Sequence, residues 1–425
     1  MKKHVINLKR LMETLKISNK VGQICETGVR RITLTKEDKI MRDIFTSWLE
    51  EEGLDVRVDD FGNIYGRREG LRNDLAPVMT GSHLDTQPFG GRYDGILGVL
   101  SALEMMKVLN ENNVQTLRPI EIVNFTNEEG YRFNATSGSE GVTNISTKEK
   151  LHNDKDDKGI SFKDALEKIG YLGDEKNRAK EIHSYVELHI EQGPILEQKN
   201  KSIGIVEGDT GSEEMEIIVK GKTGHATATP MEMRKDALIK AAEIIVMAQE
   251  VTKELEGTLT VGKLDMEPEG FHIIREVTIP MTILHPDISV RDQMIETINE
   301  KAFALVEQEE MEIEIKESLF KASTAYFSEP IRNEIETVVQ DLGYTSLKMM
   351  SRGFHDANNI ATIAPTGMLF IPCKDGISHS VEEFVSEKDI EKGANVLLHT
   401  VLNLAQQEDA LQWSPASENK NLLGM

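Results

Sequence analysis

Five histidine and acidic residues each lie next to an apolar run of the kind that forms a buried strand. They occur in five separate motifs: His83 in Gly81-Ser-His-Leu-Asp-Thr, Asp94 in Gly90-Gly-Arg-Tyr-Asp-Gly, Glu129 in Asn127-Glu-Glu-Gly, His189 in Val186-Glu-Leu-His-Ile-Glu and His379 in Gly376-Ile-Ser-His-Ser. Open α/β sheets place ligands beyond the carboxyl ends of their strands, so these side chains can converge. Three imidazoles and two carboxylates without a thiolate suit two borderline cations, such as zinc or manganese, bridged by one carboxylate.

Two further carboxylates extend this set. Asp85 lies two residues after His83 and faces the same way if the strand continues, so it can orient the imidazole from behind. Glu128 directly precedes Glu129, and adjacent acids repel each other. A cation that neutralises Glu129 and leaves Glu128 as a general base explains the pair. The alternatives are a solvated acidic loop and, for His83 alone, a histidine satisfied at a strand end.

The elements that must position these residues alternate between strand and helix. The sequence predicts strands at 54–58, 76–83, 120–125, 186–190 and 367–371, and helices at 36–49 and 95–110. Thr35-Lys-Glu-Asp and Ser386-Glu-Lys-Asp are predicted to begin helices as capping boxes. Alternation of this kind is typical of an α/β domain with a mixed, mainly parallel sheet.

From about Ser212 the order changes to strand, helix, strand, strand, helix, strand. The strands are predicted near 216–219, 259–264, 277–283 and 311–315, and the helices at 236–251 and 292–308. This is the order of a ferredoxin-like α+β domain built from split βαβ units. We therefore expect a metal-binding catalytic domain at 1–211 and 328–410, an inserted domain at 212–327 and a polar tail at 411–425.

The composition limits the environment and the partners. A chain of 425 residues exceeds what one core usually covers, in keeping with two domains. The net charge of -23 argues against nucleic acid or an anionic membrane as partner, because phosphate contacts need a basic surface. Only two cysteines are present, no apolar run is long enough to cross a membrane, and no export signal is seen. We expect a cytoplasmic protein.

The ordered motifs resemble those of a known family. The set GSHLDT, GGRYDG, NEEG, ELHIEQGP, GHATATPM, HDA and GISH is similar to the hydantoinase/carbamoylase branch of the M20 metallopeptidase clan. That branch includes N-carbamoyl-L-amino-acid hydrolases, allantoate amidohydrolases and β-ureidopropionases. The resemblance runs over roughly residues 5–410, and the motif set is much more specific to the branch than to any one of its substrates.

The resemblance implies metal-dependent hydrolysis of a linear amide or ureido C–N bond. It makes Asp94 a bridging ligand between two divalent ions, zinc first with manganese, cobalt or nickel as alternatives. His83 and His189 would bind separate ions, Glu129 and His379 would complete the coordination, and Glu128 would be the general base. His225 would come from the lid domain of a partner subunit and steady the oxyanion, which implies a homodimer. Gln192 and His355 match positions close to the substrate.

Several departures from the family pattern fall on substrate recognition. His272 occupies the position of a usual asparagine, Leu284 that of an arginine that grips a carboxylate, and Phe354 that of a small residue; Gly224-His-Ala-Thr replaces the usual N-H-A-G turn. Losing the arginine removes a bidentate, charge-assisted contact. A more apolar or uncharged amide therefore fits better than an ordinary N-carbamoyl-α-amino acid, unless Arg275 or His272 takes over the anion contact.

Three other classes of function are alternatives: a hydrolase of another amide, a protein without activity, and a dinucleotide-binding enzyme. An N-acyl amidase, an aminoacylase or a dipeptidase-like hydrolase would use the same metal ligands. A catalytically silent binding or regulatory dimer would account for the altered recognition positions, but it would have no use for buried acids and histidines, which are costly to desolvate. A dinucleotide-binding enzyme is disfavoured because no GxGxxG follows the first strand.

Overall fold

The computed structural model describes residues 4–267, 270–307, 309, 311–321, 325–411 and 413. These residues form two compact units, and the chain passes into the second unit between Gly208 and Asp209 and returns between Ala325 and Tyr326. The predicted boundaries at 212 and 327 lie close to these points. The predicted polar tail, 411–425, falls almost entirely outside the described residues.

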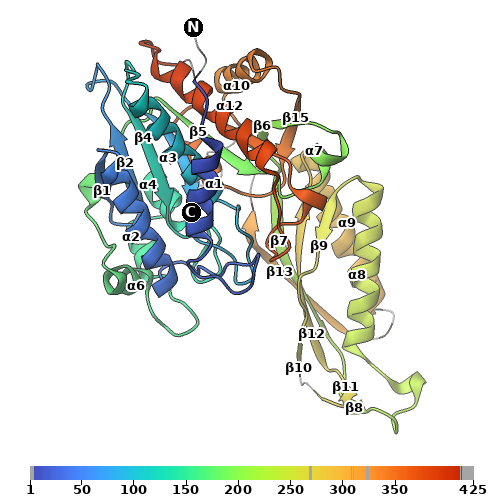
Figure 1. Cartoon of the computed structure of the whole chain (residues 1–425). Helices are drawn as coiled ribbons and strands as arrows, with labels where there is room; N and C mark the ends of the chain where they lie inside the picture. The colour runs from blue at the N-terminus through green and yellow to red at the C-terminus, as the bar shows by residue number, and fades with distance from the viewer. Residues whose placement is uncertain are drawn as a thin grey trace. The chain divides into compact units, whose positions relative to one another are not determined.

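The first unit is built on a mixed sheet of nine strands (Figure 1). Its order is β1-β2-β4-β3-β5-β16-β6-β14, with β15 beside β6. The four central strands β4, β3, β5 and β16 are parallel, and the flanking pairs β1·β2, β2·β4 and β16·β6 are antiparallel. The strands are β1 (Asp55–Val58), β2 (Ile64–Arg68), β3 (Val78–His83), β4 (Ile120–Phe125), β5 (Ser184–Ile190), β6 (Ile203–Asp209), β14 (Ala325–Tyr326), β15 (Ser346–Ser351) and β16 (Thr366–Ile371).

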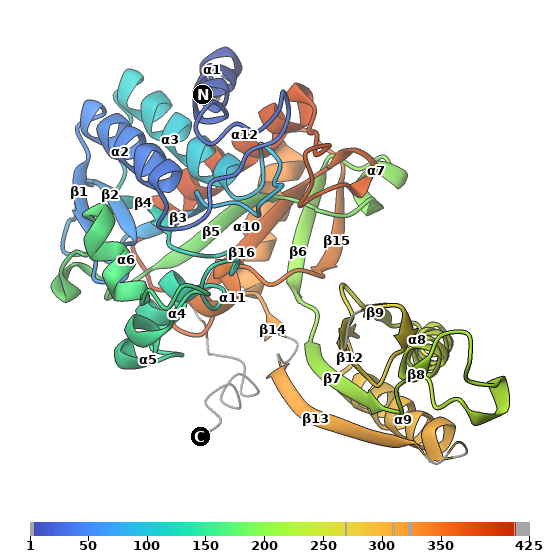
Figure 2. The same cartoon turned by 90° about the horizontal axis from the view of Figure 1, so that it is seen from below.

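Helices cover both faces of this sheet, which buries the central strands completely (Figure 2). One face packs on α3 (Ile96–Glu111) and α12 (Glu387–Ala405), supported by α1 (Leu8–Ser18), α2 (Lys36–Glu51) and α10 (Glu329–Asp341). The opposite face packs on α11 (Asp356–Ile360), which contacts α4 (Ser137–Thr143). Alternate strand residues enter the two cores, for example Val78 and Met79. Such near-continuous apolar strands are typical of parallel sheets.

The two predicted capping boxes differ in outcome. Ser386 caps α12 as predicted, because its Oγ accepts the Asp389 N–H at 3.1 Å. The capping box at Thr35 is wrong: Thr35 Oγ1 donates to the Ile32 carbonyl instead of accepting from the first turn of α2. The Asp38 carboxylate accepts the Leu34 N–H at 2.7 Å, so it fixes the chain just before the helix.

The second unit is a five-stranded antiparallel sheet packed on two helices. The sheet order is β10-β12-β7-β13, with β9 also beside β12, which is the ferredoxin-like order expected from the sequence. The predicted strand near 259–264 is two short strands, and the sequence did not predict a separate ribbon of β8 and β11. The elements are β7 (Ser212–Lys220), β8 (Gly224–His225), α8 (Ala237–Glu254), β9 (Thr258–Thr260), β10 (Asp265–Glu267), β11 (His272–Ile273), β12 (Glu276–Leu284), α9 (Ile288–Glu307) and β13 (Glu312–Lys321).

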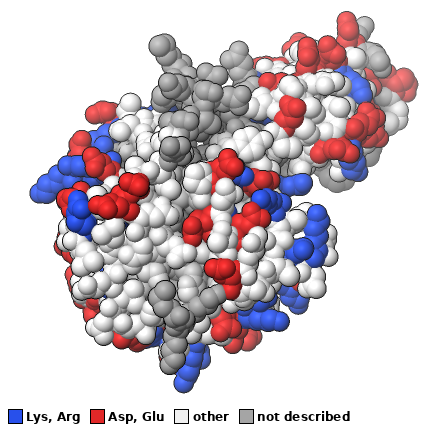
Figure 3. Space-filling model, turned by 90° about the horizontal axis from the view of Figure 1, so that it is seen from above, with Lys and Arg blue, Asp and Glu red and all other residues white. Residues whose placement is uncertain are grey.

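The chain has an excess of acidic residues, but one face of the molecule carries charged side chains of both signs (Figure 3). On the face shown in Figure 3, acidic and basic side chains are interspersed with uncharged ones. Among the described residues, no helix has the length and apolar character needed to cross a membrane.

Candidate metal and catalytic site

The site begins where β3 ends and α3 begins. His83 is the last residue of β3, and Asp94 lies in the turn just before α3; both side chains are buried. Gly95, the N-cap of α3, has a φ of 65°, and a Cβ there would lie 2.3 Å from the His83 ring. Glycine is therefore required at this position both for the backbone conformation and for the close approach of the main chain to the imidazole.

A first group of possible metal ligands consists of His83, Asp94 and His189. One ligand atom from each lies within 4.8 Å of the others. His189 comes from β5, which is the direct neighbour of β3, and the two imidazole rings are 6.0 Å apart. The sequence analysis expected His83 and His189 to bind separate ions. In the structure both lie in one group with Asp94, because parallel neighbours end at the same edge of the sheet.

A second group shares Asp94 with the first. It consists of Asp94, Glu129 and His379, again with ligand atoms within 4.8 Å of one another. Asp94 Oδ1 lies 3.1 Å from Nε2 of His189, whereas Oδ2 lies 3.1 Å from Nε2 of His379. Nε2 of His379 is also 3.3 Å from Glu129 Oε2. Asp94 therefore has the arrangement of a carboxylate that bridges two centres.

The chemistry of these donors fits divalent cations. Nε2 of His83 and both ring nitrogens of His355 are buried and have no hydrogen-bond partner among the described residues. Buried polar atoms are normally satisfied, so orphaned imidazole nitrogens that face carboxylates indicate a missing positive partner. Nitrogen and oxygen donors without sulfur are the set that suits zinc, manganese or related ions.

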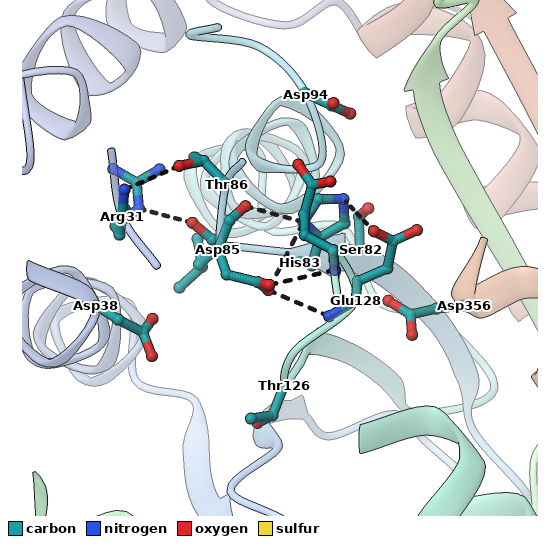
Figure 4. A network of polar contacts seen from close by, with 12 residues as sticks. Arg31, Asp38, Ser82, His83, Asp85, Thr86, Asp94, Thr126, Glu128 and Asp356 are labelled. Carbon is teal, nitrogen blue, oxygen red and sulfur yellow. Dashed lines mark hydrogen bonds and ion pairs between the residues drawn. The ribbon is translucent and has the colours of Figure 1, made fainter. Parts of the chain in front are cut away.

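Glu128 lies beside the first group. Its Oε2 is 3.5 Å from Nε2 of His83, and its side chain is 10% exposed. Figure 4 shows that Asp85 approaches the Glu128 backbone while Asp356 lies close beside the Glu128 carboxylate. The Asp85 carboxylate accepts the N–H groups of Glu128 and Glu129 at 3.4 and 3.3 Å. Asp85 therefore fixes the turn that carries both acids.

The contact of Asp85 with His83 differs from the predicted one. Nδ1 of His83 lies 3.1 Å from the Asp85 carbonyl oxygen but 3.8 Å from the carboxylate. The nearer oxygen is the backbone one because the chain turns directly after β3 instead of continuing as a strand. A carbonyl at Nδ1 stabilises the tautomer that protonates Nδ1, which leaves Nε2 free to face the site.

The electrostatics describe a pocket crowded with carboxylates. Although burial alone would lower them, the hydrogen bonds with Asp94 raise the pKa values of His189 and His379 to about 9. Burial, together with the charge of Glu129, raises the pKa of Glu128 well above its usual value. Burial and Asp94 raise the pKa of Glu129 to about 8, and burial raises that of Asp85 to about 7. Burial lowers the pKa of His83 to about 4, so its imidazole is neutral and able to act as a ligand at neutral pH.

Two residues predicted near the substrate also lie at this site. The Gln192 side-chain amide donates to both oxygens of Asp94 at 3.2 and 3.1 Å. His355 is 2% exposed, its ring lies 4.6 Å from that of His189, and its Nδ1 is 3.9 Å from Glu128 Oε1.

The remaining predicted residues belong to the second unit. His225 is exposed on β8, and its Nδ1 accepts the N–H groups of Thr227 and Ala228. His272 lies directly opposite His225 in the β8–β11 ribbon, so both side chains project from the same face of that ribbon. Arg275 is exposed just after β11.

The sequence analysis did not single out three buried acids of the site. Glu187 forms a third possible ligand group with His189 and His355, and Asp356 accepts a hydrogen bond from Ser139 at 2.5 Å. Glu383 accepts the N–H of Asp94 at 3.2 Å. For Glu187 a signal was present, because it precedes His189 by two residues on one strand and so shares its face. Asp356 follows no predicted strand, although it lies in the HDA motif, and Glu383 lies in no motif that the sequence analysis used.

Comparison with known proteins identifies the family. The model of Peptidase family M20/M25/M40 matches residues 79–403. The chain belongs to this family. It is 38% identical over 405 residues to an N-carbamoyl-L-amino-acid amidohydrolase of Rhizobium meliloti. The matched region covers 94% of this chain and 97% of the relative. A ureidoglycolate hydrolase of Oryza sativa subsp. japonica is 32% identical over 401 residues, covering 89% of this chain and 81% of the relative.

A solved structure shows the same relationship. An amidase of the hydantoinase/carbamoylase family from Burkholderia multivorans is 37% identical, with a TM-score of 0.87 over 95% of this chain and 99% of the other. The predicted resemblance and the predicted α/β architecture are therefore confirmed. This member of the M20 family is a hydrolase of C–N bonds other than peptide bonds. It contains groups of histidine and acidic residues able to hold metal ions.

Proposed function

We propose that this M20 protein uses two divalent cations to hydrolyse a linear ureido bond, with N-carbamoyl amino acids and related ureido acids as first candidates. The observation that carries the proposal is the geometry of the Asp94 carboxylate: one oxygen lies beside His189 and the other beside His379. The names of the relatives support the substrate class, because they include both carbamoyl-amino-acid and ureidoglycolate hydrolases.

In this proposal each ligand group holds one cation. His83, Asp94 and His189 bind the first, and Asp94, Glu129 and His379 bind the second. Zinc is the first candidate, with manganese, cobalt and nickel as alternatives that the same donors accept. When bound, the two cations would polarise the scissile carbonyl and acidify the water that attacks it.

Glu128 supplies the proton transfers. Its carboxylate takes a proton from the attacking water and delivers it to the leaving nitrogen as the C–N bond breaks, so that the amine departs neutral. The position of Glu128 suits this role, because its Oε2 lies 3.5 Å from Nε2 of His83, beside the first ligand group. Asp85 holds the Glu128 backbone, and Gln192 and His355, which lie next to proposed ligands, would contact the substrate.

We further propose that the second unit is a lid and dimerisation domain in a cytoplasmic homodimer. His225 projects from an exposed ribbon, as a group that acts on another subunit's site must. A groove of about 670 Å³ between α8 and α9 is lined by partly exposed apolar side chains, including Ile239 and Val246, and it offers a surface for a second copy. His225 would then stabilise the oxyanion in the partner's site.

A second candidate substrate is a neutral N-acyl amide. It is favoured by Leu284, which is partly exposed at the end of β12 where relatives of this branch are expected to carry an arginine. A panel that compares N-carbamoyl amino acids with uncharged N-acyl amides of the same side chain separates the two. Higher kcat/KM for the carbamoyl acids supports the first candidate, and the reverse order supports the second.

The decisive variant is Glu128→Gln. It keeps the shape of the side chain and all proposed metal ligands, so two ions should remain bound while kcat falls by about 10³-fold or more. Coexpression with His225→Ala then tests the dimer: each variant alone is inactive, but mixed dimers hold one site with an intact Glu128 and the partner's intact His225. Up to about one quarter of the wild-type activity should return. An active Glu128→Gln enzyme would refute the mechanism.

A further inference from the structure

Glu383 is a buried acid that lies between two loops of the site. It follows His379 by four residues, and its side chain is 1% exposed. Its own N–H donates to the Ser380 carbonyl at 3.1 Å, which ties its backbone to the turn that carries His379. The carboxylate reaches away from this turn toward the residues before α3.

Both oxygens of the Glu383 carboxylate are used. Oε1 accepts the backbone N–H of Tyr93 at 2.9 Å and that of Asp94 at 3.2 Å. Oε2 accepts the Ser378 hydroxyl at 3.0 Å, and this hydroxyl also lies 3.4 Å from Asp94 Oδ2. The approach is tight, because a Cβ at Gly91 would lie 2.1 Å from the Glu383 carboxyl carbon. One side chain therefore joins the Asp94 turn to the His379 turn.

Burying a second carboxylate so near Asp94 is unfavourable unless something is gained. The two negative charges repel, and no cationic side chain makes an ion pair with Glu383 among the described residues. Hydrogen bonds to backbone N–H groups orient the main chain but do not neutralise the charge. What the Glu383 carboxylate does provide is a fixed position for the main chain of Asp94 and for the Ser378 hydroxyl.

We propose that Glu383 is a positioning residue for the second cation site, formed by Asp94, Glu129 and His379. This rests on the proposed metal-dependent function. The first group draws His83 and His189 from strand ends, whereas His379 lies in a turn with a φ of 53° and a side chain that is 49% exposed. Two of the three residues of the first group are thus held by strands, whereas none of the second group is, so the link between the Asp94 and His379 turns matters most for the second group. Outer residues that orient metal ligands commonly change metal affinity 10–100-fold.

The test compares Glu383→Ala with Glu383→Gln and with the control Glu382→Ala, whose side chain is the exposed neighbour. Metal content is measured after dialysis against limiting zinc, and the affinity for each ion by titration. Glu383→Ala should keep one ion where the wild type and the control keep two, and its affinity for the second ion should fall about 10–100-fold. Excess zinc should restore kcat with little change in KM.

The conservative variant distinguishes positioning from a merely structural role. Glu383→Gln retains an oxygen for the two N–H donors, and its amide can donate to Ser378, so it should bind the second ion nearly as the wild type does. If Glu383→Ala fails to fold, Ser378→Ala removes one of the links and should weaken the second ion by a smaller factor.

Equal affinity for both ions in Glu383→Ala would overturn the inference, as would parallel loss of both ions or an equal loss in Glu382→Ala. A wild-type protein that binds no ion would instead refute the proposed function.

Discussion

The two ligand groups of the site share Asp94 but are built differently. His83 is the last residue of β3 and His189 the last but one of β5. These two parallel strands are neighbours, and both side chains are buried. Glu129 and His379 come from turns, and their positions depend on cross-links from other loops. Gln87, for example, donates from its side-chain amide to the Glu129 carboxylate at 2.8 Å and to its carbonyl at 2.9 Å. A site can thus contain one position fixed by the core and one that relies on side-chain contacts.

The difference has a functional consequence. Strand ends in a close-packed core move little, so the first group is preorganised before any ion arrives. Turns lie at the less stable end of a protein's local structure, so the second group has to be ordered in part by the ion it binds. We therefore expect the first position to bind its ion more tightly than the second.

Removing the shared ligand should erase the difference between the two positions. Asp94→Ala takes one ligand from each group, so neither ion should remain after dialysis against limiting metal. Loss of the cations removes several kcal/mol of transition-state stabilisation, and kcat/KM should fall by about 10³-fold or more. Metal analysis and steady-state kinetics measure both effects. Asp74→Ala, which changes an exposed acid, is the control. A variant that still binds two ions would show that Asp94 does not bridge them.

Removing one ligand from each side should separate the two positions. His379→Ala should retain the first ion and lose at least about 100-fold in affinity for the second. His83→Ala should instead lose the tighter ion, so that at one equivalent of zinc it binds less metal than His379→Ala. Titration at equal protein concentration gives both values. If the two variants kept the same amount of metal, the first ligand group would not be more preorganised than the second.

The sequence predicted the strand-end part of the site better than the loop part. His83 and His189 could be placed because each follows an apolar strand, and parallel strands end at one edge of a sheet. Their grouping with one another could not be predicted, because sequence does not say which strands are neighbours, and β3 and β5 are adjacent although they lie far apart in the chain. Glu383 and Asp356 could not be placed, since they contact residues far away in the chain: Glu383 accepts from the Asp94 N–H, and Asp356 of α11 accepts from Ser139 of α4.

A similar limit applies to the fold. The order of elements predicted both the parallel centre of the mixed sheet and the ferredoxin-like topology of the second unit, because hydrophobic periodicity is local. The β8–β11 ribbon was not predicted, since each of its strands has only two residues and no alternation can be detected at that length. Thr35 shows that even a local motif can fail when its hydroxyl finds a nearer carbonyl.

The smallest predicted effect is a dependence of stability on pH in the metal-free protein. The pKa values of Asp85 and Glu129 are raised to about 7 and about 8 by burial and by neighbouring acids. An acid with a raised folded-state pKa contributes stability that is present below its unfolded pKa and lost as the pH rises through the folded value. His83, whose pKa is lowered to about 4, titrates below this window. The metal-free protein should therefore unfold at a lower temperature at about pH 8.5 than at about pH 6.

Bound cations should reverse this trend, because they bind only the folded protein and need deprotonated ligands. The increase in unfolding temperature on adding zinc should therefore be a few degrees larger at the higher pH. Glu128→Gln is the matched variant: it removes one buried carboxylate but no proposed ligand, so the metal-free form should lose less stability as the pH rises. Differential scanning calorimetry with and without chelator measures these shifts. If the zinc-dependent increase were the same at both pH values, Asp85 and Glu129 would not control the stability of the metal-free site, and the carboxylate-rich second position would differ from the first in mobility alone.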